Sequence, residues 1–295
     1  MKRDYFQLDE QAELFELLSK KPKWWKELIG DNDLYCNIRK GNRINVYYRG
    51  ASIMDLFCKN GKIEAKIHNY YLGYEKNMCE EYKVKYGYIS LNPEDIICRI
   101  PTIKKRVEIN KKNKADIDFG EEREDNISEK YIQSQMYLEN KLYIDTEFAL
   151  TLDDGTNIRI DLVRLSEDGA VCFEELKLID DPRLKPKGKE QAEIITQMKN
   201  YDKFLKEASK IKGSNSEPII IEYYSKVLRI MKKIGILRTE FEPKYVRDHI
   251  NLFIKLTYTK KHPKRNHAMT TIQNVCKGLH SNIEDVVKEY ENLRK

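Results

Sequence analysis

Apolar residues in the first part of the chain follow a helical and then a strand-like spacing. Residues 6–28 have apolar side chains separated by charged ones, which predicts a helix. Short stretches rich in β-branched and aromatic residues follow, with glycine turns between them, and they predict strands. Residues 52–57 fit a helical turn. The predicted strands are 34–39, 43–48 and 62–71.

A polar segment separates this part from the rest of the chain. Residues 110–126 contain almost no large apolar side chain, so we expect a linker there and a domain boundary near residue 120. The boundary gives an α+β domain over 1–120, with a role in recognition or regulation, and a second domain over 121–295. Both parts mix helices with strands, which predicts an α/β (α+β) fold class.

The pattern beyond the polar segment is more regular. Ser128 is a good N-cap for a helix, and Asp154-Gly155 is a strong hairpin turn signal. Alternating and β-branched stretches predict strands, and apolar stripes predict helices. The predicted strands are 143–152, 157–165, 170–179 and 249–259, and the predicted helices are 129–140, 190–211, 222–237 and 282–294.

Composition excludes several broad classes of protein. Apolar residues make up 40% of the chain and charged residues 35%, which is typical of a folded protein with a charged surface. We find neither the run of about 18 apolar residues that spans a bilayer nor the apolar core of a signal peptide. The 6 cysteines and 5 histidines are dispersed, so we expect no structural zinc site and reduced thiols in a cytoplasmic protein.

Basic residues are concentrated in two segments, although the net charge is only +6. The segment 249–283 contains no acidic residue, and the run 99–114 contains only Glu108. Local surpluses of positive charge bind phosphate backbones. We interpret 99–114 as a linker, and for 249–283 nucleic-acid binding and a solvated face remain equal alternatives.

The predicted hairpin 157–179 brings charged residues together. If its turn centres on Asp168, residues whose numbers sum to 336 face each other, which sets Asp161 opposite Glu175. Lys177 shares their face because side chains alternate along a strand. The neighbouring residues are apolar, and two buried carboxylates ~4 Å apart repel by about 4 kcal/mol at an effective dielectric of 20.

A cation is needed to offset this repulsion. Lys177 is one candidate, and Mg²⁺ or Mn²⁺ is the other, because hard divalent cations prefer oxygen ligands. The backbone carbonyl of Leu176 could supply a further ligand. A bound metal would lower the pKa of a water molecule, with Lys177 beside it to stabilise charge. The alternative is a charged solvent face of an antiparallel sheet.

These residues resemble the signature of the PD-(D/E)XK nuclease superfamily. The matching motifs are Asp161 in RIDLV, Glu175-Leu176-Lys177 in FEELK, and Gln197 with Tyr201 in TQMKNYDKF, the D…ExK…QxxxY pattern of the RecB-type branch. The resemblance covers roughly 125–260. It implies a restriction-endonuclease-like core, a mixed sheet flanked by helices. One departure is Ile160, which stands where the family motif has proline.

The resemblance also implies roles for individual residues. Asp161 and Glu175 correspond to metal ligands and Lys177 to the catalytic lysine, while Gln197 and Tyr201 line the site. Glu129 is the best match for a further metal-binding glutamate, although a first-turn glutamate also complements a helix dipole. Glu147 and Glu174 are expected to point away from the site.

A Mg²⁺-dependent deoxyribonuclease, acting in bacterial defence or DNA processing, is therefore the expected function. The alternatives are a catalytically silent nucleic-acid-binding or assembly protein with the same fold, and a nuclease directed at RNA. A homo-oligomer or a defence-system partner is left open. The basic residues expected to contact DNA are Lys185, Lys187, Lys189, Lys260, Lys261, Lys264 and Arg265.

Overall fold

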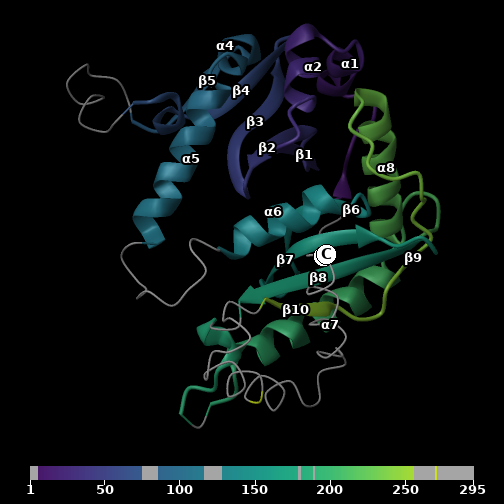
Figure 1. Cartoon of the computed structure of the whole chain (residues 1–295). Helices are drawn as coiled ribbons and strands as arrows, with labels where there is room; N and C mark the ends of the chain where they lie inside the picture. The colour runs from purple at the N-terminus through teal and green to yellow at the C-terminus, as the bar shows by residue number, and fades with distance from the viewer. Residues whose placement is uncertain are drawn as a thin grey trace.

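The computed structural model describes residues 6–74, 86–115, 128–178, 181–188, 190–255 and residue 270. The chain is a mixed α+β protein with two five-stranded sheets, one from each half of the chain (Figure 1). No helix within these ranges is long and apolar enough to cross a membrane.

The N-terminal sheet is an antiparallel meander in which each strand pairs with the next along the chain. Its strands are β1 (Leu34–Arg39), β2 (Arg43–Tyr48), β3 (Ala51–Lys59), β4 (Lys62–His68) and β5 (Tyr88–Leu91). The surrounding elements are α1 (Glu13–Ser19), α2 (Lys23–Ile29), the short 3-10 helix η2 (Asn69–Leu72), α4 (Pro93–Ile97) and α5 (Ile100–Ala115). The predicted strands 34–39 and 43–48 are confirmed with the same bounds.

Two secondary-structure predictions for residues 6–59 are wrong. The expected helix 6–28 is divided into α1 and α2, because Lys21 adopts a left-handed φ of 50° and Pro22 follows it. Residues 52–57 belong to β3 and do not form a helical turn. The pairing of β3 with β2 on one side and β4 on the other overrides its local preference.

The basic run 99–114 is also not a linker. It forms α5, which is anchored in the apolar core by Ile103 and Val107, both almost fully buried. Apolar residues four apart lie on one helix face, so Ile103 and Val107 pack into the core together. The basic run therefore belongs to a folded element. The predicted domain boundary near residue 120 lies outside the described residues.

The C-terminal sheet is mixed, as expected. Strands β6, β7 and β8 are antiparallel, whereas β9 and β10 both run parallel to β8. Helix α6 lies over one face of this sheet and α7 over the other (Figure 1). The strands are β6 (Tyr143–Thr151), β7 (Asn157–Leu165), β8 (Ala170–Leu178), β9 (Tyr245–Val246) and β10 (Asn251–Lys255). The helices are α6 (Glu129–Glu139), the short 3-10 helix η3 (Pro182–Leu184), α7 (Glu193–Lys210) and α8 (Ile219–Ile234).

Local signals in this half are mostly confirmed. The Ser128 side chain caps α6 by accepting a hydrogen bond from the Tyr131 amide at 3.2 Å. Strand β7 has the predicted bounds, β6 ends one residue earlier than expected, and β8 matches its prediction as far as Leu178, beyond which residue 179 is not described. The helix predicted over 282–294 lies outside the described residues.

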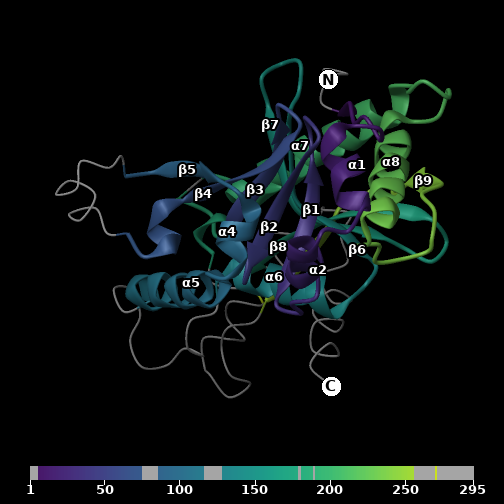
Figure 2. The ribbon, with the colours of Figure 1, turned by 90° about the horizontal axis from the view of Figure 1, so that it is seen from above.

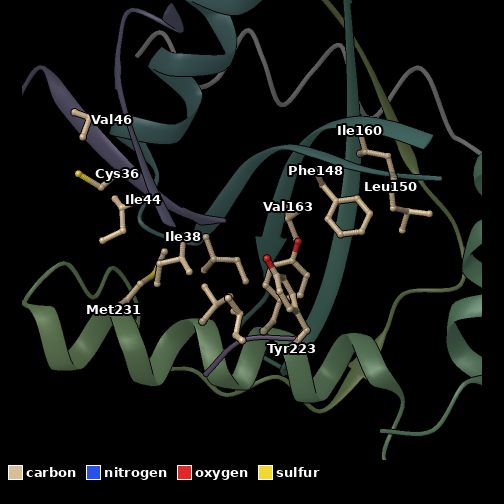
Figure 3. Close-up of a cluster of buried hydrophobic side chains, with 14 of the residues drawn as sticks. Cys36, Ile38, Ile44, Val46, Phe148, Leu150, Ile160, Val163, Tyr223 and Met231 are labelled. Atoms are coloured by element: carbon tan, nitrogen blue, oxygen red, sulfur yellow. The ribbon is translucent and has the colours of Figure 1, made fainter. Parts of the chain in front are cut away.

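One apolar core joins the two halves. Ile38 and Ile44 of the N-terminal sheet pack in the same cluster as Phe148, Val163 and residues of α8 (Figure 3). Helix α1 lies beside α8 in the view from above (Figure 2). The Trp25 indole donates a hydrogen bond to the Ile234 carbonyl at 2.8 Å, so polar contacts also cross between the halves.

Candidate active site

The candidate site lies where β7 and β8 separate. The predicted register is confirmed over the paired part of these strands, from Leu165 opposite Val171 to Leu162 opposite Glu174. The ladder stops there, one position before Asp161. The Asp161 carboxylate continues it, because Oδ2 accepts a hydrogen bond from the Leu176 amide at 2.9 Å.

Oxygen atoms from several elements surround the ammonium group of Lys177. Nζ is hydrogen-bonded to Glu175 Oε1 and donates to the Leu176 carbonyl at 2.8 Å. Asp161 Oδ2 and Glu129 Oε1 each lie 3.6 Å from the same nitrogen. The Lys177 side chain is only 1% exposed, so this charge lies in the protein interior. The predicted residues of β7, β8 and α6 therefore meet at one point.

Helix α7 holds the Glu175 carboxylate from the other side. Gln197 Nε2 lies 2.7 Å from Glu175 Oε1, and the Tyr201 hydroxyl lies 2.9 Å from Oε2. Gln197 also donates to the Tyr201 hydroxyl at 2.6 Å, as the spacing of four residues on one helix allows. Tyr201 further contacts the Arg159 carbonyl, which ties α7 to β7. Both oxygens of Glu175 are thus engaged.

The buried charges shift one another's pKa. Burial raises the pKa of Glu175 to about 8, and the neighbouring Asp161 charge adds to this shift. Burial also raises the pKa of Glu129. Burial alone would lower the pKa of Lys177, but Glu175, Asp161 and Glu129 raise it instead. The carboxylates therefore stabilise the charged form of Lys177, and this single ammonium only partly offsets their negative charges.

Helix α6 contributes a residue that the sequence interpretation missed. Gln133 is buried and its amide donates to the Asp161 backbone carbonyl. It follows Glu129 by four residues, so both side chains point toward the same part of the sheet. That spacing was the available signal. Asp161 is consequently held at its carbonyl by α6 and at its carboxylate by β8.

The loop after β8 brings a second cation to Glu129. Arg183 Nη2 lies 3.6 Å from Glu129 Oε2, and its guanidinium also pairs with Asp181. Of the basic residues expected to contact DNA, Lys185 is exposed and Lys187 pairs with Glu193. The others lie outside the described residues: Lys189, Lys260, Lys261, Lys264 and Arg265.

The arrangement does not form a ready coordination shell. Across the described ranges, no group of three or more His, Cys, Asp or Glu side chains is spaced to hold a metal ion. The oxygen donors of Asp161, Glu175, Glu129 and Leu176 converge on the Lys177 ammonium instead. Their chemistry suits a hard divalent cation.

Glu147 and Glu174 make their ion pairs with residues other than Lys177. The β6–β7 register would set Glu147 opposite Asp161, but Glu147 has a left-handed φ of 54° and is skipped in the pairing, whereas Glu174 precedes Glu175 on β8 and alternates to the other face. Glu147 pairs with Lys130 and Arg159, and Glu174 with Arg164. Comparison of this chain with family models, with curated protein sequences and with solved structures finds no match.

Proposed function

We propose that this chain is a metal-dependent nuclease that hydrolyses DNA phosphodiester bonds at the site around Lys177. The observation that carries the proposal is the convergence of three carboxylates and a backbone carbonyl on one buried lysine. With all three carboxylates ionised, one ammonium leaves a negative surplus in a buried place, and a divalent cation would offset it. A purely structural ion pair has no need of the additional acids.

The residues fit a Mg²⁺ or Mn²⁺ site by their donor chemistry. Asp161, Glu175 and the Leu176 carbonyl would hold the ion, with Glu129 as a further ligand. The ion would lower the pKa of a bound water and offset charge on the phosphate. The Lys177 ammonium lies among these oxygens, so it and the ion would compete for the same ligands.

The protein's own groups would divide the remaining work. Lys177 would stabilise the negative charge that develops on the phosphate oxygens. Gln197 and Tyr201 act as positioning residues, because they fix both oxygens of Glu175. Gln133 and the Leu176 amide do the same for Asp161.

The order of elements also supports a PD-(D/E)XK relationship. The helix α6, the meander β6–β7–β8, the helix α7 and the parallel strand β10 follow the order that this superfamily predicts. The motif residues lie on the second and third strands of the meander and on the following helix.

The test is incubation of the purified chain with single- and double-stranded DNA and RNA in Mg²⁺, Mn²⁺ or EDTA. We expect DNA cleavage that requires metal and is lost in Lys177→Ala and Asp161→Asn. Asp154→Asn is the matched control, since Asp154 pairs with Lys203 at the exposed hairpin of the same sheet. Cleavage that persists in EDTA, or in both site variants, would contradict the proposal.

The same experiment distinguishes the alternatives. Preferential cleavage of RNA selects an RNA-directed nuclease with the same site. DNA binding that weakens with salt but is never followed by cutting selects a silent binding protein. In that case the Lys177 network is a closed set of charges that stabilises the fold.

A further inference from the structure

Glu129 lies between two cations that differ in their access to solvent. Its Oε1 is 3.6 Å from Lys177 Nζ, and its Oε2 is 3.6 Å from Arg183 Nη2. The Lys177 side chain is 1% exposed, whereas that of Arg183 is 40% exposed. Arg183 therefore stands at the rim of the candidate site, on the side open to an incoming molecule.

Arg183 is held in place more firmly than an ordinary loop residue. Its backbone amide donates to Asp181 Oδ1 at 2.8 Å, and its Nε donates to the same oxygen at 2.9 Å. The next residue, Leu184, is fully buried and anchors the 3-10 turn in the core. The guanidinium is thus fixed before any ligand arrives, which reduces the entropy lost on binding.

The two edges of the guanidinium differ in their contacts. The Nε and Nη2 groups face Asp181, and Nη2 also faces Glu129. Nη1 makes no hydrogen bond to any residue that the structure describes. A fixed arginine with free donors is suited to a phosphate oxygen, because its planar fork binds phosphate through directed hydrogen bonds.

The neighbouring lysines are less suited to this role. Lys187 pairs with Glu193, its side chain is 64% exposed, and nothing fixes it toward the site. Lys185 follows the turn and is exposed. They can add to a general attraction for nucleic acid, whereas Arg183 has a defined position beside Glu129.

We propose that Arg183 binds a phosphate of the nucleic-acid substrate next to the Lys177 centre. This inference rests on the proposed nuclease function and names the residue that brings the phosphodiester to the site. The phosphate would take the place of Glu129 beside the guanidinium, while Asp181, its nearest carboxylate, keeps the guanidinium in place. Glu129 would then be available as the further metal ligand.

The test compares Arg183→Ala and Arg183→Lys with a matched control, Arg43→Ala. Arg43 also pairs with an aspartate, Asp55, and is 46% exposed, but it lies on the N-terminal sheet. Binding of a fluorescent DNA duplex is measured by anisotropy in EDTA at several salt concentrations. Single-turnover cleavage of the same duplex is measured in Mg²⁺.

The salt dependence is the slope of the logarithm of the binding constant against the logarithm of the salt concentration. We expect Arg183→Ala to reduce the magnitude of this slope by about 0.9, the contribution of one phosphate contact. Its cleavage rate should fall about 10²-fold, as for loss of one charge-stabilising donor. Arg183→Lys should recover the salt dependence but not the rate, since it keeps the charge and loses the fork. Arg43→Ala should match the wild type in both measurements.

The other outcomes distinguish failure of the phosphate contact from failure of the nuclease function. If the wild type cuts DNA and Arg183→Ala keeps the wild-type salt dependence, the phosphate contact is overturned while the nuclease function stands. This holds even if the rate falls, because Arg183 then only positions Glu129. If no substrate is cut but the salt dependence falls, the contact stands and the nuclease function fails. A wild-type chain that neither binds nor cuts DNA overturns both.

Discussion

The Asp161 carboxylate accepts a hydrogen bond from the Leu176 amide at 2.9 Å, directly beyond the last backbone pair of β7 and β8. The Asp161 side chain here takes the place of the next backbone hydrogen bond between the two strands. The amide that would otherwise be unpaired is satisfied, and the carboxylate is fixed beside Lys177. One aspartate thus serves both the sheet and the candidate site.

This double role predicts different outcomes for two substitutions of Asp161. Asp161→Asn keeps an oxygen for the Leu176 amide, so its stability should remain close to that of the wild type. Asp161→Ala should lose about 1–3 kcal/mol, because the amide is left without its acceptor. Both should lose cleavage by about 10²–10³-fold. Urea denaturation in EDTA measures the first effect and single-turnover cleavage the second.

Metal binding can be measured on the same variants without reference to activity. Mn²⁺ at a hundred times its dissociation constant should stabilise the wild type by about 2.7 kcal/mol, and Asp161→Asn should show almost none of this gain. Asp154→Asn is again the control and should respond like the wild type. Equal stabilisation of wild type and Asp161→Asn would place the metal elsewhere.

Gln197, Tyr201 and Glu175 should behave as one energetic unit. Gln197 and Tyr201 bond to each other and to opposite oxygens of Glu175. Tyr201→Phe should cost about 1–3 kcal/mol, because buried polar partners lose a hydrogen bond. Combined with Gln197→Ala, the two effects should depart from additivity by at least about 0.5 kcal/mol. A double-mutant cycle in urea measures this, and strict additivity would show that the contacts are independent.

A buried ion pair also connects the two halves. Arg39 pairs with Asp145, which is nearly fully buried, and also donates to the Thr146 carbonyl at 2.7 Å. Arg39→Met should cost about 3–5 kcal/mol, because it removes the cation that pairs with the buried Asp145 charge. Arg43→Met, at the more exposed pair with Asp55, should cost at most about 1 kcal/mol.

Two probes check whether the halves unfold together. Both tryptophans, Trp24 and Trp25, lie on α2, so fluorescence reports on the N-terminal half, whereas circular dichroism reports on the whole chain. The continuous core predicts coincident urea transitions by the two probes. Separate transitions would mean that the halves are independent folding units, as a domain boundary near residue 120 would allow.

The elements near the site could be predicted because their signals are local. The turn at Asp154-Gly155, the cap at Ser128 and the alternation along β7 depend on adjacent residues only. The conformations of β3 and α5 depend on contacts with other elements instead. Residues 52–57 become a strand because neighbouring strands pair with them, and the basic run 99–114 becomes a helix because Ile103 and Val107 reach the core.

Spacing along the chain predicted some residues of the candidate site and not others. Strand alternation was sufficient to group Asp161, Glu175 and Lys177, and helical spacing was sufficient to add Gln197 with Tyr201. Arg183 could not be found by spacing, because its approach to Glu129 depends on where the fold places the η3 turn. The position of the Lys177 ammonium among the carboxylates likewise depends on tertiary packing and could not be predicted from spacing.

Glu222 near the start of α8 provides a pH-dependent contact away from the site. Burial would raise the pKa of Glu222, but hydrogen bonds from Lys226 and Ser214 outweigh it and lower the pKa to about 2. The Ser214 hydroxyl lies 2.7 Å from Oε1, so the charged carboxylate fastens the loop before α8. A lowered carboxyl pKa means that the folded state binds the proton less tightly than the unfolded state does.

The stability that Glu222 contributes should therefore be complete above its ordinary pKa of 4.5 and disappear as the pH falls toward about 2. Glu222→Gln should be less stable than the wild type by on the order of 1 kcal/mol at pH 7. The difference should shrink steadily when urea denaturation is repeated at lower pH. Glu217→Gln, an exposed glutamate in the same loop, is the control and should follow the wild type at every pH. A Glu222→Gln difference that stays constant with pH would mean that this contact does not depend on the charge.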